Sequence, residues 1–190
     1  DNALLVPAYL DAFLATGEAR HARVARGCCE WVLREMTTPE GGFASAQDAD
    51  SEGVEGKFFA WTPRELESVL GAKLGAWAAA WFGVTVEGNF EHGTSVLWRH
   101  DPPETVARQL GVPLATLEPA MEEARARLFA ARSRRIAPGT DDKVLAAWNG
   151  LMIAALARAG CVLDEPRYVE AARRAGQRGH WPLQTNNVAH

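Results

Sequence analysis

Two short segments of this 190-residue chain carry the residues best suited to chemistry. The first, residues 41–61, reads GGFASAQDADSEGVEGKFFAW and places four carboxylates among aromatic side chains. The second, residues 141–150, reads DDKVLAAWNG, in which three charged residues are followed directly by apolar ones. Long loops that are both acidic and aromatic are commonly functional. We therefore expect a polar site at the mouth of a helical scaffold.

Acid/base chemistry on a sugar is one interpretation of these two segments. Glycoside hydrolysis needs two carboxyl groups across a cleft, one of them kept protonated by apolar surroundings. Aromatic rings beside them offer faces on which the C–H surface of a sugar can stack. The candidate catalytic residues are Asp48, Asp50, Glu52, Asp141 and Asp142. The candidate substrate-binding residues are Phe59, Trp61, Glu91, Lys143, Trp148 and Asn149.

Each of these residues also has a structural interpretation. Asp141 would cap the helix that follows it, and the loop acids would be solvated surface groups. Lys143 would pair with the neighbouring aspartates, and Trp148 fits a helix core better than a substrate platform. Asn149, a polar residue in an apolar helix, must be hydrogen-bonded. For the loop acids, both interpretations stay open.

Calcium binding is a further interpretation of the acidic loop. Asp48, Asp50, Glu52 and Gly53 occupy the first, third, fifth and sixth places of an EF-hand loop. The twelfth place, which requires a bidentate Glu, holds Phe59, and no clear helix leads into Asp48. We therefore predict no metal site. The chain also has no P-loop, dinucleotide fingerprint or His/Cys metal spacing, and we predict no cofactor.

Composition excludes several classes of function. The net charge is −4 and the basic residues are dispersed, which argues against nucleic-acid binding. No apolar run reaches the ~18 residues that a membrane span needs. The start lacks both a signal peptide and an initiating Met, so we expect a truncated start. Three cysteines without Cys-x-x-Cys spacing favour small buried residues in a reducing cytoplasm.

Hydrophobic periodicity predicts a mainly helical protein. Helices are expected at residues 2–16, about 18–36, 117–135, 142–159 and from about 166. The tetrad at 62–65, TPRE, combines an N-cap, a proline at the first helical position and a capping box, and residues 101–104 repeat this pattern. Strand-like pieces at 57–61 and 95–98 predict a small β ribbon beside the helices.

The helices also contain an internal repeat. Shifting residues 2–26 by 147 positions, without gaps, aligns Asn2 with Asn149, and it aligns Glu18 with Glu165. Each copy consists of an apolar helix, a short turn and a more polar helix. An apolar helix beside an amphipathic one is what the inner and outer helices of a toroid require.

Three stretches carry a resemblance to a known family: residues 41–66, residues 88–97 (GNFEHGTSVL) and residues 141–160 (DDKVLAAWNGLMIAALARAG). They resemble the thioredoxin-domain-containing, spermatogenesis-associated protein family, whose members are largely uncharacterised in function. The resemblance implies an N-terminal thioredoxin-like domain, absent here, joined to an (α/α) toroid similar to six-hairpin glycosidases and N-acylglucosamine 2-epimerases. We expect residues 1–175 to be a partial toroid domain, and residues 176–190 to be an unrelated tail of a fragment.

The resemblance implies a carbohydrate-active scaffold, glycosidase-like or epimerase-like, and glycoside hydrolysis is the chemistry expected if the scaffold is catalytic. An epimerase would need paired histidines facing each other, and none of the five in this chain is persuasively placed; His92 departs from the family pattern. The expected partners are a sugar-like small molecule, the remaining toroid helices and the thioredoxin-like domain. The alternative is a non-catalytic interaction or regulatory module, whose acidic loop packs on that domain.

Overall fold

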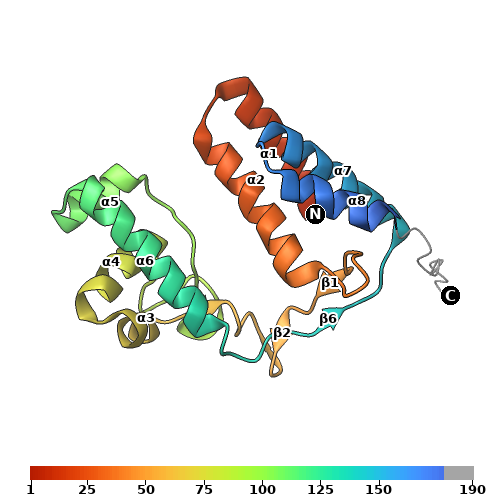
Figure 1. The fold of residues 1–190 in the computed structure, drawn as a ribbon. Helices are drawn as coiled ribbons and strands as arrows, with labels where there is room; N and C mark the ends of the chain where they lie inside the picture. Colours follow the sequence, from red (N-terminus) through yellow and green to blue (C-terminus); the bar gives the residue numbers. More distant parts are fainter. Residues whose placement is uncertain (178–190) are drawn as a thin grey trace. The chain divides into compact units, whose positions relative to one another are not determined.

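The computed structural model describes residues 1–177, which form a mainly helical protein with short antiparallel strand pairs (Figure 1). The mainly helical prediction is confirmed. The chain divides into two compact units. Unit 1 comprises Asp1–Gln47 and the chain from Thr140 onward, and unit 2 comprises Asp48–Gly139. Most of the predicted tail, residues 178–190, lies outside the described residues.

Unit 1 consists of two helical hairpins and one short ribbon. The hairpins are formed by α1 (Asn2–Thr16) with α2 (Ala19–Trp31), and by α7 (Ala146–Val162) with α8 (Pro166–Gln177). A single π-helical turn, η1 (Val32–Met36), continues α2. The ribbon pairs β1 (Ala46–Gln47) with β6 (Thr140–Asp141) in antiparallel register. The two apolar helices, α1 and α7, pack against each other.

The predicted repeat corresponds to these two hairpins. Gly17 ends α1 in the left-handed region, with φ of 70°, and Asp164 follows α7 in the same region, with φ of 54°. These two positions are 147 residues apart, the shift that aligns the repeat. Asp11 and Arg158, which are also equivalent under this shift, form an ion pair between α1 and α7. The repeat therefore places equivalent residues side by side.

Unit 2 contains four helices, and its helix starts follow the sequence signals only in part. The helices are α3 (Pro63–Leu70), α4 (Ala72–Phe82), α5 (Pro103–Leu110) and α6 (Leu114–Arg132), with a 3-10 turn, η2, at Glu91–Gly93. At α3 the predicted capping box is present, because Thr62 and Glu65 exchange side chain to backbone hydrogen bonds. At α5 the N-cap is Pro102 and no side chain caps the helix, so the repeated pattern there does not form a capping box.

Two further ribbons complete unit 2. β2 (Asp50–Ser51) pairs with β3 (Val54–Glu55), and β4 (Ala60–Trp61) pairs with β5 (Ser95–Val96). The second pair confirms the ribbon predicted from residues 57–61 and 95–98, although each strand has only two residues. Leu66, Leu117 and Leu128 are among the residues of the helical core beneath it.

The boundaries of two helices in unit 1 differ from the prediction. The helix expected at 142–159 begins at Ala146, and its N-cap is Leu145. Asp141 instead lies in β6, so its interpretation as a helix cap is wrong. The helix expected to reach residue 36 changes at Trp31 from α to π geometry. Among the described helices, none combines the length and the apolar character that spanning a lipid bilayer would take.

Candidate functional site

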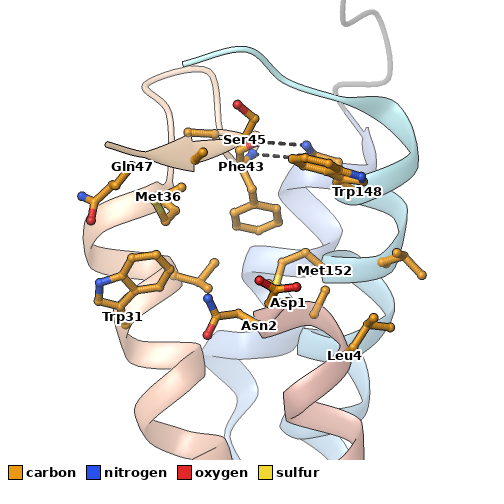
Figure 2. A pocket seen from close by; sticks show the side chains of 16 residues that line it. Asp1, Asn2, Leu4, Trp31, Met36, Phe43, Ser45, Gln47, Trp148 and Met152 are labelled. Carbon is orange, nitrogen blue, oxygen red and sulfur yellow. Dashed lines mark hydrogen bonds between the residues drawn. The ribbon is translucent and has the colours of Figure 1, made fainter. Parts of the chain in front are cut away.

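Unit 1 contains a cavity of about 510 Å³ at the end where α1 and α7 begin (Figure 2). Pockets for small molecules usually measure about 300–1,000 Å³. The lining comes from four segments: residues 1–4, residues between 31 and 36, residues 43–47, and residues between 148 and 152. The pocket therefore lies where the first turns of both repeats meet the loop that follows η1.

Three aromatic side chains line the pocket. Figure 2 shows Trp31 and Trp148 on opposite sides of the pocket, with the ring of Phe43 between them. Phe43 is buried, whereas Trp148 is 54% exposed although it lines the pocket. The interpretation of Trp148 as a core residue is therefore wrong. Its open face suits the alternative, a platform on which a ligand can stack.

One wall of the pocket is the extended segment 43–47. Ala44 donates its backbone N–H to Met36, at 2.8 Å, and Ser45 donates its own to the carbonyl of Asp141, at 3.1 Å. Gln47 then pairs with Thr140 in the β1–β6 ribbon. The wall thus joins the end of η1 on one edge and β6 on the other.

Asn149 holds this wall against α7. Its Oδ1 accepts the backbone N–H of Phe43 at 2.8 Å, and its Nδ2 donates to the carbonyl of Phe43 at 2.9 Å. The same Nδ2 donates to the carbonyl of Leu145 at 3.1 Å. Asn149 is 1% exposed, and both of its N–H groups are used. The predicted hydrogen bonding is confirmed, and the contacts favour a supporting role over direct contact with substrate.

The π-helical turn shapes the opposite side. Val32 and Met36, at the two ends of η1, are buried and line the pocket. A π turn widens the helix by one residue, and such turns are frequent at functional sites. Apolar spacing predicts a helix over residues 18–36 but does not distinguish α from π geometry, so the change after Trp31 was not predicted.

The charged residues of the second segment lie beside the pocket wall. Asp141 accepts hydrogen bonds from Lys143, from Nζ at 3.1 Å and from the backbone N–H at 3.3 Å. These hydrogen bonds, the one from the side chain first, hold the pKa of the Asp141 carboxyl below its ordinary value. Asp141, Asp142 and Lys143 are exposed, and none of the three lines the pocket. Lys143 is therefore the ion-pair partner that the structural interpretation predicted.

The acidic loop belongs to unit 2, and its acidic side chains make contacts within the loop. Asp48 accepts the backbone N–H of Asp50 through Oδ1, at 3.2 Å, which forms a short turn. Glu52 adopts a φ of 55° and pairs with Lys57 at 2.8 Å. Asp48, Asp50 and Glu52 are exposed. Within residues 1–177, no group of three or more acidic, His or Cys side chains is arranged to hold a metal ion.

Arg135 organises the aromatic end of that loop. Its guanidinium donates to the carbonyl of Ala60 at 2.7 Å and to Glu65 at 3.1 Å. It also lies 4.0 Å from the centroid of the Trp61 ring. Trp61 is 3% exposed, so it cannot stack on a ligand, which contradicts its assignment as a substrate-binding residue. Phe59 is partly buried and packs edge-on against Phe58.

The candidates from the sequence therefore divide between the two units. Trp148 and Asn149 lie at the pocket of unit 1, whereas Asp48, Asp50, Glu52, Phe59, Trp61 and Glu91 belong to unit 2. Glu91 is exposed in η2, beside His92. Sequence reasoning did not identify Asn2, Trp31, Phe43 and Gln47 as pocket residues. For Asn2 a signal was available, because the repeat aligns it with Asn149.

Comparison with known proteins identifies relatives but no described activity. No family model matches the chain. Spermatogenesis-associated protein 20 from Homo sapiens is 33% identical over 90% of this chain, and the Rattus norvegicus protein of that name is 32% identical over the same share. The chain is a homologue of spermatogenesis-associated protein 20. The resemblance to the spermatogenesis-associated family is thereby confirmed.

The match covers only part of each relative. The chain spans about a quarter of the length of the curated relatives it matches, 25% for the human and rat proteins. An uncharacterized protein from Caenorhabditis elegans is 29% identical over 93% of this chain, which corresponds to 27% of that protein. The names of these relatives state no substrate, reaction or ligand.

Proposed function

We propose that unit 1 is part of an (α/α) toroid of the carbohydrate-active kind, and that its pocket binds a sugar-like small molecule. The observation that carries this proposal is the exposed ring of Trp148, which lines a pocket of about 510 Å³ opposite Trp31. Two repeated helical hairpins with apolar first helices support the toroid. Their starts converge on the same pocket.

The chemistry of the lining suits a neutral polyol. The aromatic rings offer apolar faces, and side-chain carboxylate, amide and hydroxyl groups of Asp1, Asn2, Ser45 and Gln47 lie around them. Ligand pockets combine a mainly apolar lining with a few polar groups that fix orientation. A sugar ring presents the complementary surface, because its C–H faces are apolar and its hydroxyl groups at the edge form hydrogen bonds.

The geometry supports binding more directly than hydrolysis. Hydrolysis needs two carboxyl groups facing each other across the bound sugar. Among the described residues that line the pocket, the only carboxylate side chain is that of Asp1. Asp141 lies behind the wall, paired with Lys143. Acid/base chemistry by Asp141, Asp142 or the loop acids Asp48, Asp50 and Glu52 therefore stays a prediction for activity assays to test.

The experiment is a binding screen with a matched tryptophan control. Six sugars (glucose, mannose, galactose, N-acetylglucosamine, cellobiose and maltose) are titrated into the intact protein and followed by NMR and calorimetry. Trp148→Ala is compared with Trp98→Ala, because Trp98 is 53% exposed and belongs to unit 2. Loss of one aromatic stacking contact should weaken binding about two- to tenfold for Trp148→Ala. Trp98→Ala should leave the affinity unchanged.

The outcome also separates binding from catalysis. Absence of binding for all six sugars, or equal effects of the two tryptophan variants, would overturn the proposal. Incubation with cellobiose and maltose, followed by analysis of the products, tests hydrolysis in the same samples. Turnover that Asp141→Asn abolishes without loss of the folded state would support acid/base chemistry.

A second candidate function, an interaction module, is favoured by exposed apolar side chains in unit 1. Leu4 and Leu14 of α1 are each 60% exposed, and Leu151 of α7 is 47% exposed. Apolar residues on two adjacent helices form a surface that other helices can cover. In this function the partners are the remaining toroid helices of a longer protein or a thioredoxin-like domain. A longer form that melts at a higher temperature, with these leucines protected from solvent, would support it.

A further inference from the structure

The repeat aligns Asn2, the first residue of α1, with Asn149, the fourth residue of α7. The two residues are 147 positions apart, which is the shift that aligns the two hairpins. The two helices also end in the same way. Gly17 and Asp164, which follow them, are 147 residues apart and both have a left-handed backbone conformation. Both asparagines line the same pocket. The repeat thus brings two equivalent carboxamides to one cavity, one from each hairpin.

Asn149 shows what a carboxamide in this place can bind. Its Oδ1 accepts from one group of Phe43 and its Nδ2 donates to the other, at 2.8 and 2.9 Å. One carboxamide can therefore bind a hydrogen-bond donor and a neighbouring acceptor at the same time, as Asn149 does with the N–H and C=O groups of Phe43. This contact builds the pocket wall and leaves no N–H of Asn149 for a ligand, because the second one binds Leu145.

Asn2 has the same groups but does not use them in this way. The hydrogen bonds found within residues 1–177 include none made by its carboxamide. The side chain is only partly buried, so solvent can reach it. Figure 2 shows Asn2 between Trp31 and Asp1, at the surface of the pocket. Its donor and acceptor are thus available to a ligand that stacks on the tryptophan rings.

We propose that Asn2 is the specificity-determining residue of this pocket and that it binds a vicinal pair of ligand hydroxyl groups. One hydroxyl donates to Oδ1 and its neighbour accepts from Nδ2, as the N–H and C=O groups of Phe43 do for Asn149. This inference rests on the proposed function, the binding of a sugar-like molecule, and it names the feature of the sugar that is recognised.

The charge of the lining narrows the ligand class further. Among the described residues around the pocket, none is Lys, Arg or His, and Asp1 contributes a carboxylate. Phosphate recognition usually depends on Arg or Lys side chains. The ligand selected by Asn2 is therefore an uncharged sugar with adjacent free hydroxyl groups, and its phosphorylated form should bind more weakly.

The test removes a hydroxyl from the ligand and the carboxamide from the protein in turn. Glucose, mannose and galactose, together with their 2-, 3- and 4-deoxy analogues, are titrated into the intact wild-type protein and into Asn2→Ala. Two lost hydrogen bonds should weaken binding of the best parent sugar about tenfold in Asn2→Ala. In wild type, the deoxy analogue that lacks a recognised hydroxyl should bind about fivefold more weakly than its parent. In Asn2→Ala this difference should disappear.

Two further variants make the result specific. Leu14→Ala removes an exposed apolar side chain of the same helix that does not line the pocket, and it should keep the preference for the parent sugar. Asn2→Gln retains the carboxamide one methylene further out, and it should restore part of the discrimination. The 6-phosphate of each parent sugar should bind more weakly than the parent itself.

The outcomes distinguish sugar binding by the pocket from the specific role of Asn2. If wild type binds none of these sugars, the proposed function fails and this inference fails with it. If wild type binds a sugar but Asn2→Ala discriminates against deoxy analogues as wild type does, the role of Asn2 is refuted and the proposed function stands. Tighter binding of the phosphorylated sugar would refute the assignment to an uncharged ligand.

Discussion

Replacement of Asn149 by Ala should destabilise unit 1 strongly, because it removes the side chain that satisfies the backbone of Phe43. In the bridge between Thr37 and Phe43, the hydrogen bonds are made by the flanking residues Thr38 and Ala44. The N–H and C=O groups of Phe43 itself point to Asn149 instead. Since Phe43 is 4% exposed, water cannot easily replace the lost partner.

The magnitude follows from the two backbone groups that would be left unpaired. Each buried unsatisfied donor or acceptor costs about 1–3 kcal/mol, so the expected loss is about 2–6 kcal/mol. Leu145 adds little to this sum, because its carbonyl keeps the backbone N–H of Asn149 at 2.9 Å. Domains are typically stable by about 5–15 kcal/mol, so the variant would lose a large share of its stability.

The matched control is Asn2→Ala, which removes the same side chain from the equivalent place in the first repeat. Within the described chain the Asn2 carboxamide makes no such contact with Phe43 or any other residue, so its loss should change stability by less than about 0.5 kcal/mol. Urea unfolding followed by far-UV circular dichroism gives both values. Hydrogen exchange at the Phe43 amide provides a local measurement, and its protection should fall in Asn149→Ala alone.

Two results would refute this reasoning. One is a loss below about 1 kcal/mol for Asn149→Ala, which would mean that the backbone of Phe43 finds other partners at no cost. The other is an equal loss for Asn2→Ala and Asn149→Ala, which would mean that the two asparagines do not differ in role.

Three further predictions concern other parts of the chain. Arg135→Lys should destabilise unit 2 by about 2 kcal/mol, because a lysine cannot reproduce the several hydrogen bonds that the planar guanidinium donates. Loss of the guanidinium from the Trp61 ring should also shift the fluorescence emission of Trp61 to longer wavelength. Unchanged melting and emission would contradict this prediction. Burial raises the pKa of the Cys29 thiol to about 12, whereas Cys161 is exposed. Ellman's reagent should therefore modify Cys161 first and Cys29 only in urea. Rapid reaction of Cys29 in the folded protein would contradict this expectation. Hydrogen bonds from Lys143 lower the pKa of Asp141 below its ordinary value of 3.8, so its carboxylate stabilises the folded protein above that pH, and this contribution is lost as pH falls through the folded-state pKa. Asp141→Asn should therefore lower the melting temperature at about pH 6, and its difference from wild type should shrink as pH falls below 3.8; a difference that does not change with pH would contradict it.

The sequence alone was sufficient where local chemistry decides structure. The capping box at Thr62 and Glu65 was predictable, because its residues contact each other within one helical turn. The two hairpins of the repeat were predictable for a similar reason, since apolar spacing and turn residues are local signals. The need of Asn149 for hydrogen bonds also followed from its place in an apolar helix, and the structure confirms it.

Long-range contacts decided what the sequence could not. Trp148 and Trp61 are both tryptophans beside charged segments, yet Trp148 is 54% exposed at a pocket and Trp61 is 3% exposed beneath Arg135. Burial of a ring depends on which residues distant in the chain pack on it, and periodicity carries no information about them. The pocket itself has the same origin, because its wall is fixed by Asn149 across 106 residues. Local sequence thus determined which helices form, and tertiary packing determined which side chains remain open to a ligand.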